Sequence, residues 1–364
     1  MARGTEGREP SFHLSQLYSP FKSWARLLGE ARAADAAPGT RKTFRQQKLG
    51  LAWDPAVDAP DYEELFKARG HHARRGVVPE WACLLTAAAD VQNDRIEWAV
   101  YAWGPEQTGA RIDWGVIWGD TATSAPYVEL ASVVQRRWPG EATVDLGLDA
   151  FGIDSGGAEG RTAKVYEFVR RAIGLRALKG SSRHDGLPLE EGSIGKARTK
   201  SGKYVKGKVW LVNGYALKKQ IYAMLYRGVT AQEEGARLPV ALYYTADSSE
   251  EHFKQLTAEV FKEPKSRRAG ARGYWEHISG RANEQLDLAV YCYALAWDKG
   301  LESWGDTEWS RLFAARAKPS EEAPLLDYAA REAAQASLPI ATAIAPAAAS
   351  IVNAADAPVS PPPR

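Results

Sequence analysis

Three aspartates lie at points where the sequence pattern predicts that secondary-structure elements begin or end. Asp90 closes the apolar run "LLTAAAD", Asp154 closes "AFGID", and Asp287 lies early in "NEQLDLAVYCYALAW". Carboxylate oxygens are ligands that Mg²⁺ and Mn²⁺ prefer, and two such ions about 3.5–4 Å apart can promote hydrolysis of a phosphodiester. The three aspartates are therefore candidates for a divalent-metal site.

Each aspartate also has a purely structural explanation. Asp90 and Asp154 could be turn acids that accept hydrogen bonds from nearby backbone amides. Asp287 could stabilise the positive end of a helix that Asn283 caps. Converging carboxylates repel one another unless cations neutralise them, however, so convergence of all three favours the metal site.

The elements that would position these aspartates form an α/β pattern. Two apolar segments, 84–90 and 95–103, flank a polar turn over 92–94 and predict a β-hairpin. Further strands and helices are then predicted along the chain: strands 111–118, 143–153, 175–180, 208–213 and 239–244, and helices 126–138, 162–173, 215–227, 249–260 and 284–298. Three antiparallel strands followed by alternating helices and strands indicate an α/β domain over residues 81–300, with a mixed sheet flanked by helices.

The two ends of the chain differ from this central region. Residues 1–80 contain short helical patterns near 21–33 and 62–69 and are interpreted as a lead-in or linker. Residues 316–364 are rich in Ala and Pro with almost no aromatic residues, so we expect a disordered tail. The sequence shows neither an apolar run of the roughly 18–20 residues that cross a bilayer nor a signal-peptide core. We therefore expect an intracellular protein with no membrane partner.

The distribution of charge along the chain gives more information about possible nucleic-acid binding than the net charge does. A net charge of +2 does not mark a nucleic-acid binder, and the two cysteines, Cys83 and Cys292, lie in apolar stretches that suggest neither a disulfide framework nor a zinc site. Two runs are strongly basic, one with Lys196, Arg198, Lys200, Lys203, Lys206 and Lys208, the other with Lys262, Lys265, Arg267, Arg268 and Arg272. Such runs attract phosphate groups, or they are solvated hairpin loops; the sequence leaves both open.

The order of these elements, with acids at those points, resembles the ribonuclease H-like nuclease fold. Local motifs extend the resemblance: "SFHLSQLYSPFKSWARL", "KTFRQQKLGLAW", "LLTAAADVQNDRIEWAVYAWG", "FGIDSGG", "HFKQLTAEV" and "NEQLDLAVYCYALAW". Over roughly residues 10–300 they are similar to the large terminase subunit of lambda-type tailed phages, the GpA family. The "DVQ" segment and the late "NE-x-LD" are the strongest parts of the resemblance.

This resemblance implies that Asp90, Asp154 and Asp287 are the catalytic acids of an endonuclease that binds one or two Mg²⁺ or Mn²⁺ ions. Such an enzyme cuts concatemeric viral double-stranded DNA in the cytoplasm of the bacterial host, with a terminase small subunit, a portal and procapsid and an ATPase motor as partners. Asp149, Glu259 and Glu284 are weaker candidates for supporting ligands, and Lys179 for a phosphate contact. The expected contacts to the DNA backbone are Lys196, Arg198, Lys200, Lys203, Lys206, Lys208, Arg267 and Arg268.

The sequence departs from the family pattern in one respect. Family members carry a packaging ATPase before the nuclease, with a loop of the form GxxxxGK[ST], and no segment of this sequence has that form. We therefore expect the endonuclease half without the motor, and no ATP hydrolysis by this chain alone. Two other interpretations remain open: a transposase- or resolvase-type enzyme with the same fold and acids, and a catalytically silent DNA-binding packaging adaptor or prophage remnant.

Overall fold

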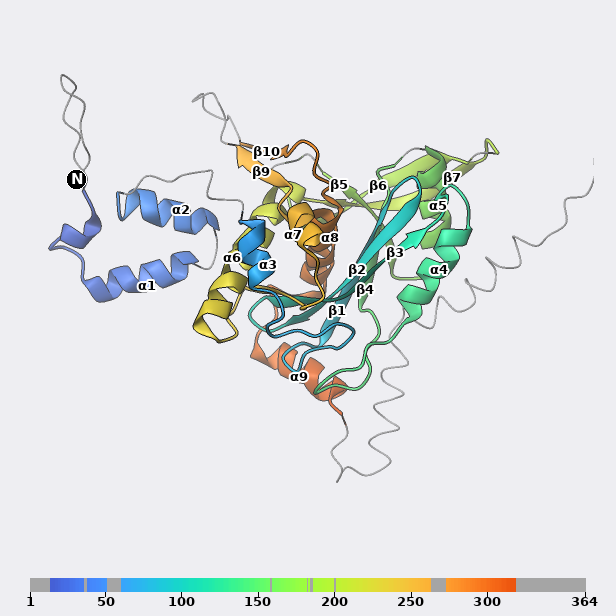
Figure 1. The fold of residues 1–364 in the computed structure, drawn as a ribbon. Helices are drawn as coiled ribbons and strands as arrows, with labels where there is room; N and C mark the ends of the chain where they lie inside the picture. The colour runs from blue at the N-terminus through green and yellow to red at the C-terminus, as the bar shows by residue number, and fades with distance from the viewer. Residues whose placement is uncertain are drawn as a thin grey trace, which may run out of the picture. The chain divides into compact units, whose positions relative to one another are not determined.

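The computed structural model describes residues 14–35, 38–50, 60–157, 159–181, 183, 186–199, 201–262 and 273–318 (Figure 1). The chain divides into two compact units, Met1–Ala59 with Phe261–Tyr274, and Pro60–Val260 with Trp275–Arg364. The first unit contains a short 3-10 helix, η1, and two α-helices: η1 Gln16–Tyr18, α1 Trp24–Asp35 and α2 Pro38–Gln47. The tail predicted from residue 316 onward lies outside the described residues from 319 to 364, so its disorder stays a prediction.

The second unit is built on an eight-stranded mixed sheet with the order β6-β7-β5-β4-β1-β2-β3-β8. Its strands are β1 Leu84–Val91, β2 Arg95–Gly104, β3 Thr108–Trp118, β4 Ala150–Asp154, β5 Leu175–Gly180, β6 Leu189–Arg198, β7 Tyr204–Val212 and β8 Leu242–Tyr244. Strands β1, β2 and β3 are antiparallel neighbours, and β4 and β5 continue the sheet from β1 in parallel. This topology confirms the predicted mixed sheet and its ribonuclease H-like arrangement.

Helices cover both faces of the sheet, as Figure 1 shows. Because side chains alternate between faces along a strand, neighbouring residues of β4 identify the two layers. Phe151 packs edge-on against Phe168 of α5, whereas a side chain at Gly152 would contact Leu295 of α8. The helices of this unit are α3 Tyr62–Lys67, α4 Ala125–Gln135, α5 Glu159–Val169, α6 Gly214–Glu234, α7 Glu250–Leu256, α8 Glu284–Lys299 and α9 Asp306–Arg316.

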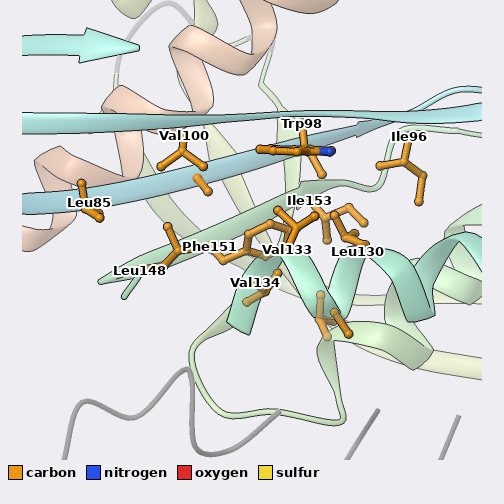
Figure 2. Close-up of a cluster of buried hydrophobic side chains, with 14 of the residues drawn as sticks. Leu85, Ile96, Trp98, Val100, Leu130, Val133, Val134, Leu148, Phe151 and Ile153 are labelled. Atoms are coloured by element: carbon orange, nitrogen blue, oxygen red, sulfur yellow. The ribbon is translucent and has the colours of Figure 1, made fainter. Parts of the chain in front are cut away.

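A large apolar core fills the layer between the sheet and helices α4 and α5. Figure 2 shows part of this core, in which side chains of β1, β2 and β4 meet one face of α4. Its labelled members are Leu85, Ile96, Trp98, Val100, Leu130, Val133, Val134, Leu148, Phe151 and Ile153. Burial of each such aliphatic side chain contributes about 1.5–3 kcal/mol, so this layer anchors the central strands that carry Asp90 and Asp154.

Several predicted boundaries are wrong. The strand predicted over 143–153 is only Ala150–Asp154, because the preceding residues form isolated bridges, such as Trp138 with Leu146, rather than a ladder. The helix predicted over 249–260 ends at Leu256, and Glu259 begins strand β9, Glu259–Lys262, which pairs with β10, Tyr274–His277. Helix α9 was not predicted. Among the described residues, none of the helices is both long and apolar enough to span a bilayer.

Candidate metal and DNA-binding site

Asp90 and Asp154 lie side by side on the two central strands. In the parallel pairing of β1 with β4, Ala89 is opposite Ile153, so the next residue on each strand is one of the two aspartates. Both carboxylates are on the face that α8 covers, because Thr86, an even number of residues before Asp90, donates a 2.9 Å hydrogen bond to the Cys292 carbonyl oxygen of α8. Asp90 is 8% exposed.

Asp287 approaches the same place from the first turn of α8. Its Oδ2 accepts a 3.2 Å hydrogen bond from Asn283 Nδ2, and its Oδ1 lies 3.7 Å from Lys218 Nζ. Asn283 occupies the N-cap position of α8, as predicted, but its side chain makes no capping hydrogen bond. Its amide instead donates to the carboxylates of Asp287 and Glu259. At the start of α8, the Asn283 side chain therefore bonds two carboxylates and does not cap the backbone amides of the helix.

The three aspartates act on one another electrostatically. Burial, together with the negative charges of Asp154, Asp287 and Glu284 and against a hydrogen bond from Gln92, raises the pKa of Asp90 to about 7. Burial is also the largest cause that raises the pKa of Asp287; with the Lys218 charge opposing the rise and Glu259 and Asp154 adding to it, the pKa is about 6. The structure thus brings the three predicted aspartates into one poorly neutralised cluster, while their catalytic role stays a prediction.

Local hydrogen bonds hold two of these carboxylates in place. Asp154 Oδ1 accepts from the Tyr291 hydroxyl at 3.0 Å, and Oδ2 accepts from the Gly156 amide at 3.0 Å. Burial raises the pKa of Asp154, and both of these bonds oppose the rise. Asp90 Oδ2 accepts from Gln92 Nε2 at 2.6 Å. Orientations fixed in this way reduce the entropy lost when the carboxylates bind a ligand.

Two of the three weaker acidic candidates belong to the cluster. Glu259 is 6% exposed, and its Oε1 lies 2.5 Å from Lys218 Nζ and 3.1 Å from Asn283 Nδ2. Glu284 is held through Oε1 by Arg95, at 3.3 Å. Its Oε2 is buried and has no hydrogen-bond partner within the described part of the chain. A buried carboxylate oxygen without a partner is costly, and a cation or a water would satisfy it.

The third weaker candidate, Asp149, does not belong to the cluster. It precedes β4, at the opposite end of that strand from Asp154, and its amide donates to the carbonyl oxygen of Leu85. Its carboxylate receives two hydrogen bonds from Arg316 of α9, at 2.5 and 2.9 Å, and one from the Leu85 amide at 2.8 Å. Asp149 therefore forms a buried ion pair with Arg316, and the structure does not bring it into the cluster.

Lys218 of α6 was missed by the sequence analysis although it is the cation closest to Asp287. Its side chain is 14% exposed and lies between Glu259 and Asp287. The segment "YALKKQIYAMLYR" offers two adjacent lysines, and nothing in it separates Lys218 from Lys219, whose ammonium lies over the Tyr215 ring. Tyr291 was missed for a similar reason, since a tyrosine on the apolar face of a helix usually belongs to the core.

The first basic run forms a β-hairpin, and its attraction for phosphate stays a prediction. Lys196 of β6 is directly opposite Lys206 of β7, and Arg198 is opposite Tyr204. All four side chains are exposed, while Val205, between them, is buried. Like charges in direct cross-strand pairing destabilise a hairpin, so an anion bound over this face would relieve the repulsion.

The exposed face of this hairpin is on the α8 side of the sheet. Trp210, which lies on the same face of β7 as Lys206, is opposite Leu178, and Leu178 is opposite Asp154. Lys208 is already paired with Glu191 at 2.7 Å. Lys203 is exposed in the hairpin turn, and Lys179 is exposed at the end of β5, close enough to lower the pKa of Asp154. The remaining predicted DNA contacts, Lys200, Arg267 and Arg268, lie outside the described residues.

The donor set suits a hard divalent cation in chemistry, although the side chains are not arranged as ligands. Among the residues that the structure describes, no group of three or more His, Cys, Asp or Glu side chains has an arrangement that could hold a metal ion. The negative charges of Asp154 and Asp287 nevertheless raise the pKa of Asp90, Asp154 raises that of Asp287, and Glu284 presents an unsatisfied buried oxygen. Oxygen-only donors with excess negative charge favour Mg²⁺ or Mn²⁺ over softer metals.

The fold and this acidic centre define a ribonuclease H-like α/β protein with a carboxylate cluster at the ends of its central strands. A family model described as "Terminase large subunit gpA, endonuclease domain" matches residues 9–309, and the chain belongs to this family. The resemblance seen in the sequence motifs is therefore confirmed.

The curated relatives include two phage proteins. The large terminase subunit of Escherichia phage lambda is 28% identical over 294 residues, which are 78% of this chain and 43% of the relative. That of Enterobacteria phage P21 is 27% identical over 302 residues, 80% of this chain and 45% of the relative. The chain thus spans less than half the length of these relatives.

Similar solved structures are also of phage terminases. The large terminase nuclease of thermophilic phage G20c has a TM-score of 0.33 and 12% identity, with 65% of this chain and 96% of that chain covered. The large terminase of bacteriophage HK97 has a TM-score of 0.33 and 6% identity, with 76% of this chain and 51% of that chain covered.

Proposed function

We propose that the chain is a metal-dependent endonuclease that hydrolyses DNA phosphodiesters, with Asp90, Asp154 and Asp287 holding one or two Mg²⁺ or Mn²⁺ ions. One observation carries the proposal: two aspartates adjacent on the central strands and one on the covering helix form a buried to half-buried cluster of like charges. Structural turn acids would be expected to be exposed or paired, whereas Asp90 is buried and close to three other acids.

The residues of the chain position the reactants in this proposal. Ions in such sites activate water and stabilise the leaving oxygen of a phosphodiester. The Tyr291 hydroxyl and the Gly156 amide hold Asp154, and Gln92 holds Asp90, so both carboxylates are fixed before a ligand arrives. Lys218 offsets part of the negative charge of Glu259 and Asp287 and thereby keeps the two acids together.

The basic hairpin would hold the DNA without reading its sequence. Lys196, Arg198 and Lys206 are exposed on the same side of the sheet as the acidic cluster, and phosphate contacts of this kind position DNA but carry no base information. Exposed Lys179 beside Asp154 would bind a phosphate closer to the cluster. Each neutralised phosphate contributes about 0.9 to the slope of log affinity against log salt concentration, so binding should weaken steeply as salt rises.

The wider role that we propose is that of the packaging enzyme in the lambda-type family. The chain would cut concatemeric viral double-stranded DNA in the bacterial host, with a small terminase subunit and a portal-bearing procapsid as partners. ATP hydrolysis would require a motor region with a GxxxxGK[ST] segment, and residues 1–364 contain no such segment. Choice of the cut site would come from a partner.

Cleavage of supercoiled plasmid tests the proposal. Wild-type protein should nick and linearise the plasmid with Mg²⁺ or Mn²⁺, and EDTA or Asp90→Asn should abolish cutting. Asp145→Asn, at an exposed carboxylate before β4, is the matched control and should cut normally. Cutting by Asp90→Asn at the wild-type rate would overturn the site assignment. DNA binding without cutting by the wild type would favour the silent adaptor, and strand transfer or junction-specific cutting would favour a transposase- or resolvase-type enzyme.

A further inference from the structure

An exposed aromatic residue lies beside the acidic cluster and has no role in the function described so far. Trp118, the last residue of β3, is 69% exposed, and Val116 on the same face is 41% exposed. Most large apolar side chains of this sheet are covered by helices, whereas the Trp118 indole is exposed to solvent. Aromatic side chains exposed in this way are enriched where a partner binds.

The strand register places Trp118 on the same face as the catalytic acids. Asp90 is opposite Glu97, Glu97 is opposite Val116, and the next pair on that face is Arg95 with Trp118. With strands about 4.8 Å apart and about 3.3 Å of rise per residue, the Trp118 backbone is roughly 12 Å from that of Asp90. The intervening Arg95 lies 5.9 Å from the Trp118 ring and bonds Glu284, which connects the indole to the cluster.

This separation fits a nucleic acid strand lying across the sheet. Successive phosphates of one DNA strand advance about 3.4 Å along the helix axis, so roughly 12 Å corresponds to three or four nucleotides, and also to the width of the major groove. A DNA strand whose scissile phosphate lies at Asp90 would extend over the basic hairpin on one side of Asp90. On the opposite side of Asp90 it would extend over Trp118.

We propose that Trp118, with Val116 beside it, is a DNA-contact surface that packs against a nucleotide three or four positions from the cleaved bond. The contact is non-ionic, since acidic side chains such as Asp94 and Glu97 surround Arg95 and leave it no free charge for a phosphate. The role of Trp118 is to position the strand, and the basic hairpin supplies the salt-dependent attraction. This inference rests on the proposed endonuclease function and adds the second boundary of its DNA-binding face.

DNA binding measured in an inactive background tests the assignment. Asp90→Asn protein with Mg²⁺ and a fluorescein-labelled duplex gives the parent Kd over a series of salt concentrations. Adding Trp118→Ala should weaken binding about five- to twentyfold, the range expected when one partly buried apolar contact is lost, without changing the salt slope. Trp118→Phe should bind like the parent because it keeps an aromatic ring, and Trp118→Gln should bind like the alanine variant.

Two control variants separate this contact from the rest of the protein. Lys196→Gln with Lys206→Gln should lower the salt slope by about 2 through loss of two phosphate contacts. Ile173→Ala, at a 78% exposed residue following α5, should change nothing. Unchanged affinity of the Trp118→Ala variant, while the hairpin variant binds more weakly, would overturn this inference alone. Complete absence of DNA binding by the parent would overturn the proposed function together with it.

Discussion

The buried position of Asp90 predicts that its removal stabilises the protein at neutral and alkaline pH. Asp90→Asn replaces a carboxylate with a neutral side chain of nearly the same shape, which still accepts the hydrogen bond from Gln92. The pKa of Asp90 is about 7 in the folded protein, against an ordinary value of 3.8. The folded state therefore binds this proton more tightly than the unfolded state does.

The sign and size of the effect follow from proton linkage. Between about pH 4 and pH 7 the folded state carries more bound proton than the unfolded state, so the free energy of unfolding falls as pH rises through this window. A shift of about three pKa units corresponds to about 4 kcal/mol. Because the charges of the cluster titrate together, we expect Asp90→Asn to be more stable than wild type by about 2–4 kcal/mol at pH 8, with little difference at pH 4.

Urea unfolding of both proteins between pH 4 and pH 8 in EDTA measures this difference. Asp145→Asn, which removes an exposed carboxylate outside the cluster, should follow the wild-type pH dependence. Millimolar Mg²⁺ should stabilise the wild type at pH 8 by about 2.7 kcal/mol if its concentration is 100 times Kd, and it should leave Asp90→Asn nearly unchanged. Equal stability of wild type and Asp90→Asn at pH 8 would show that Asp90 is not a buried, repelled carboxylate, and the reasoning would be wrong.

Three further predictions concern the partners of the acids. Lys218→Met should lower the free energy of unfolding by about 3 kcal/mol in EDTA, because it leaves Glu259 and Asp287 without their shared cation. Mg²⁺ should restore part of this stability. Thermal unfolding with and without Mg²⁺ measures both effects, and an unaltered midpoint would contradict the role of Lys218. Glu284→Gln should keep the Arg95 contact but weaken Mg²⁺ binding in calorimetric titration, and wild-type affinity would exclude Glu284 from the site. Arg316→Met should lower the free energy of unfolding in urea by about 3–5 kcal/mol, because Asp149 is left buried and unpaired. At temperatures where this variant is still folded, its plasmid cleavage should be normal. Loss of cleavage under those conditions would indicate that Asp149 belongs to the site.

The central strands were predictable because they are apolar runs of strand length that are bounded by polar turns. β1, β2 and β5 lie within one residue of their predicted limits, and Asp90 and Asp154 are at strand ends as expected. That these two aspartates are level with each other could not be derived, because the register of parallel strands is set by packing rather than by local sequence.

Long-range partners account for most of what the sequence did not predict. Asp149 and Asp154 both follow apolar residues of one predicted strand, and only the contact with Arg316, 167 residues later in the chain, distinguishes the structural acid from the cluster acid. Lys218 differs from Lys219 only in the direction it faces on α6. The basic run became a hairpin because Val205, Gly207 and Val209 alternate with the lysines and pack toward α5.

The most direct test of the central claim is to locate the metal. Crystals of the protein soaked in Mn²⁺ should show an anomalous-scattering peak bounded by the carboxylates of Asp90, Asp154 and Asp287, and the peak should be absent from crystals of Asp90→Asn. Ligand distances near 2.0–2.2 Å, with Glu284 or Glu259 completing the coordination, would match an oxygen-ligated divalent ion. A well-occupied Mn²⁺ position elsewhere on the protein with none at these three aspartates would contradict the account.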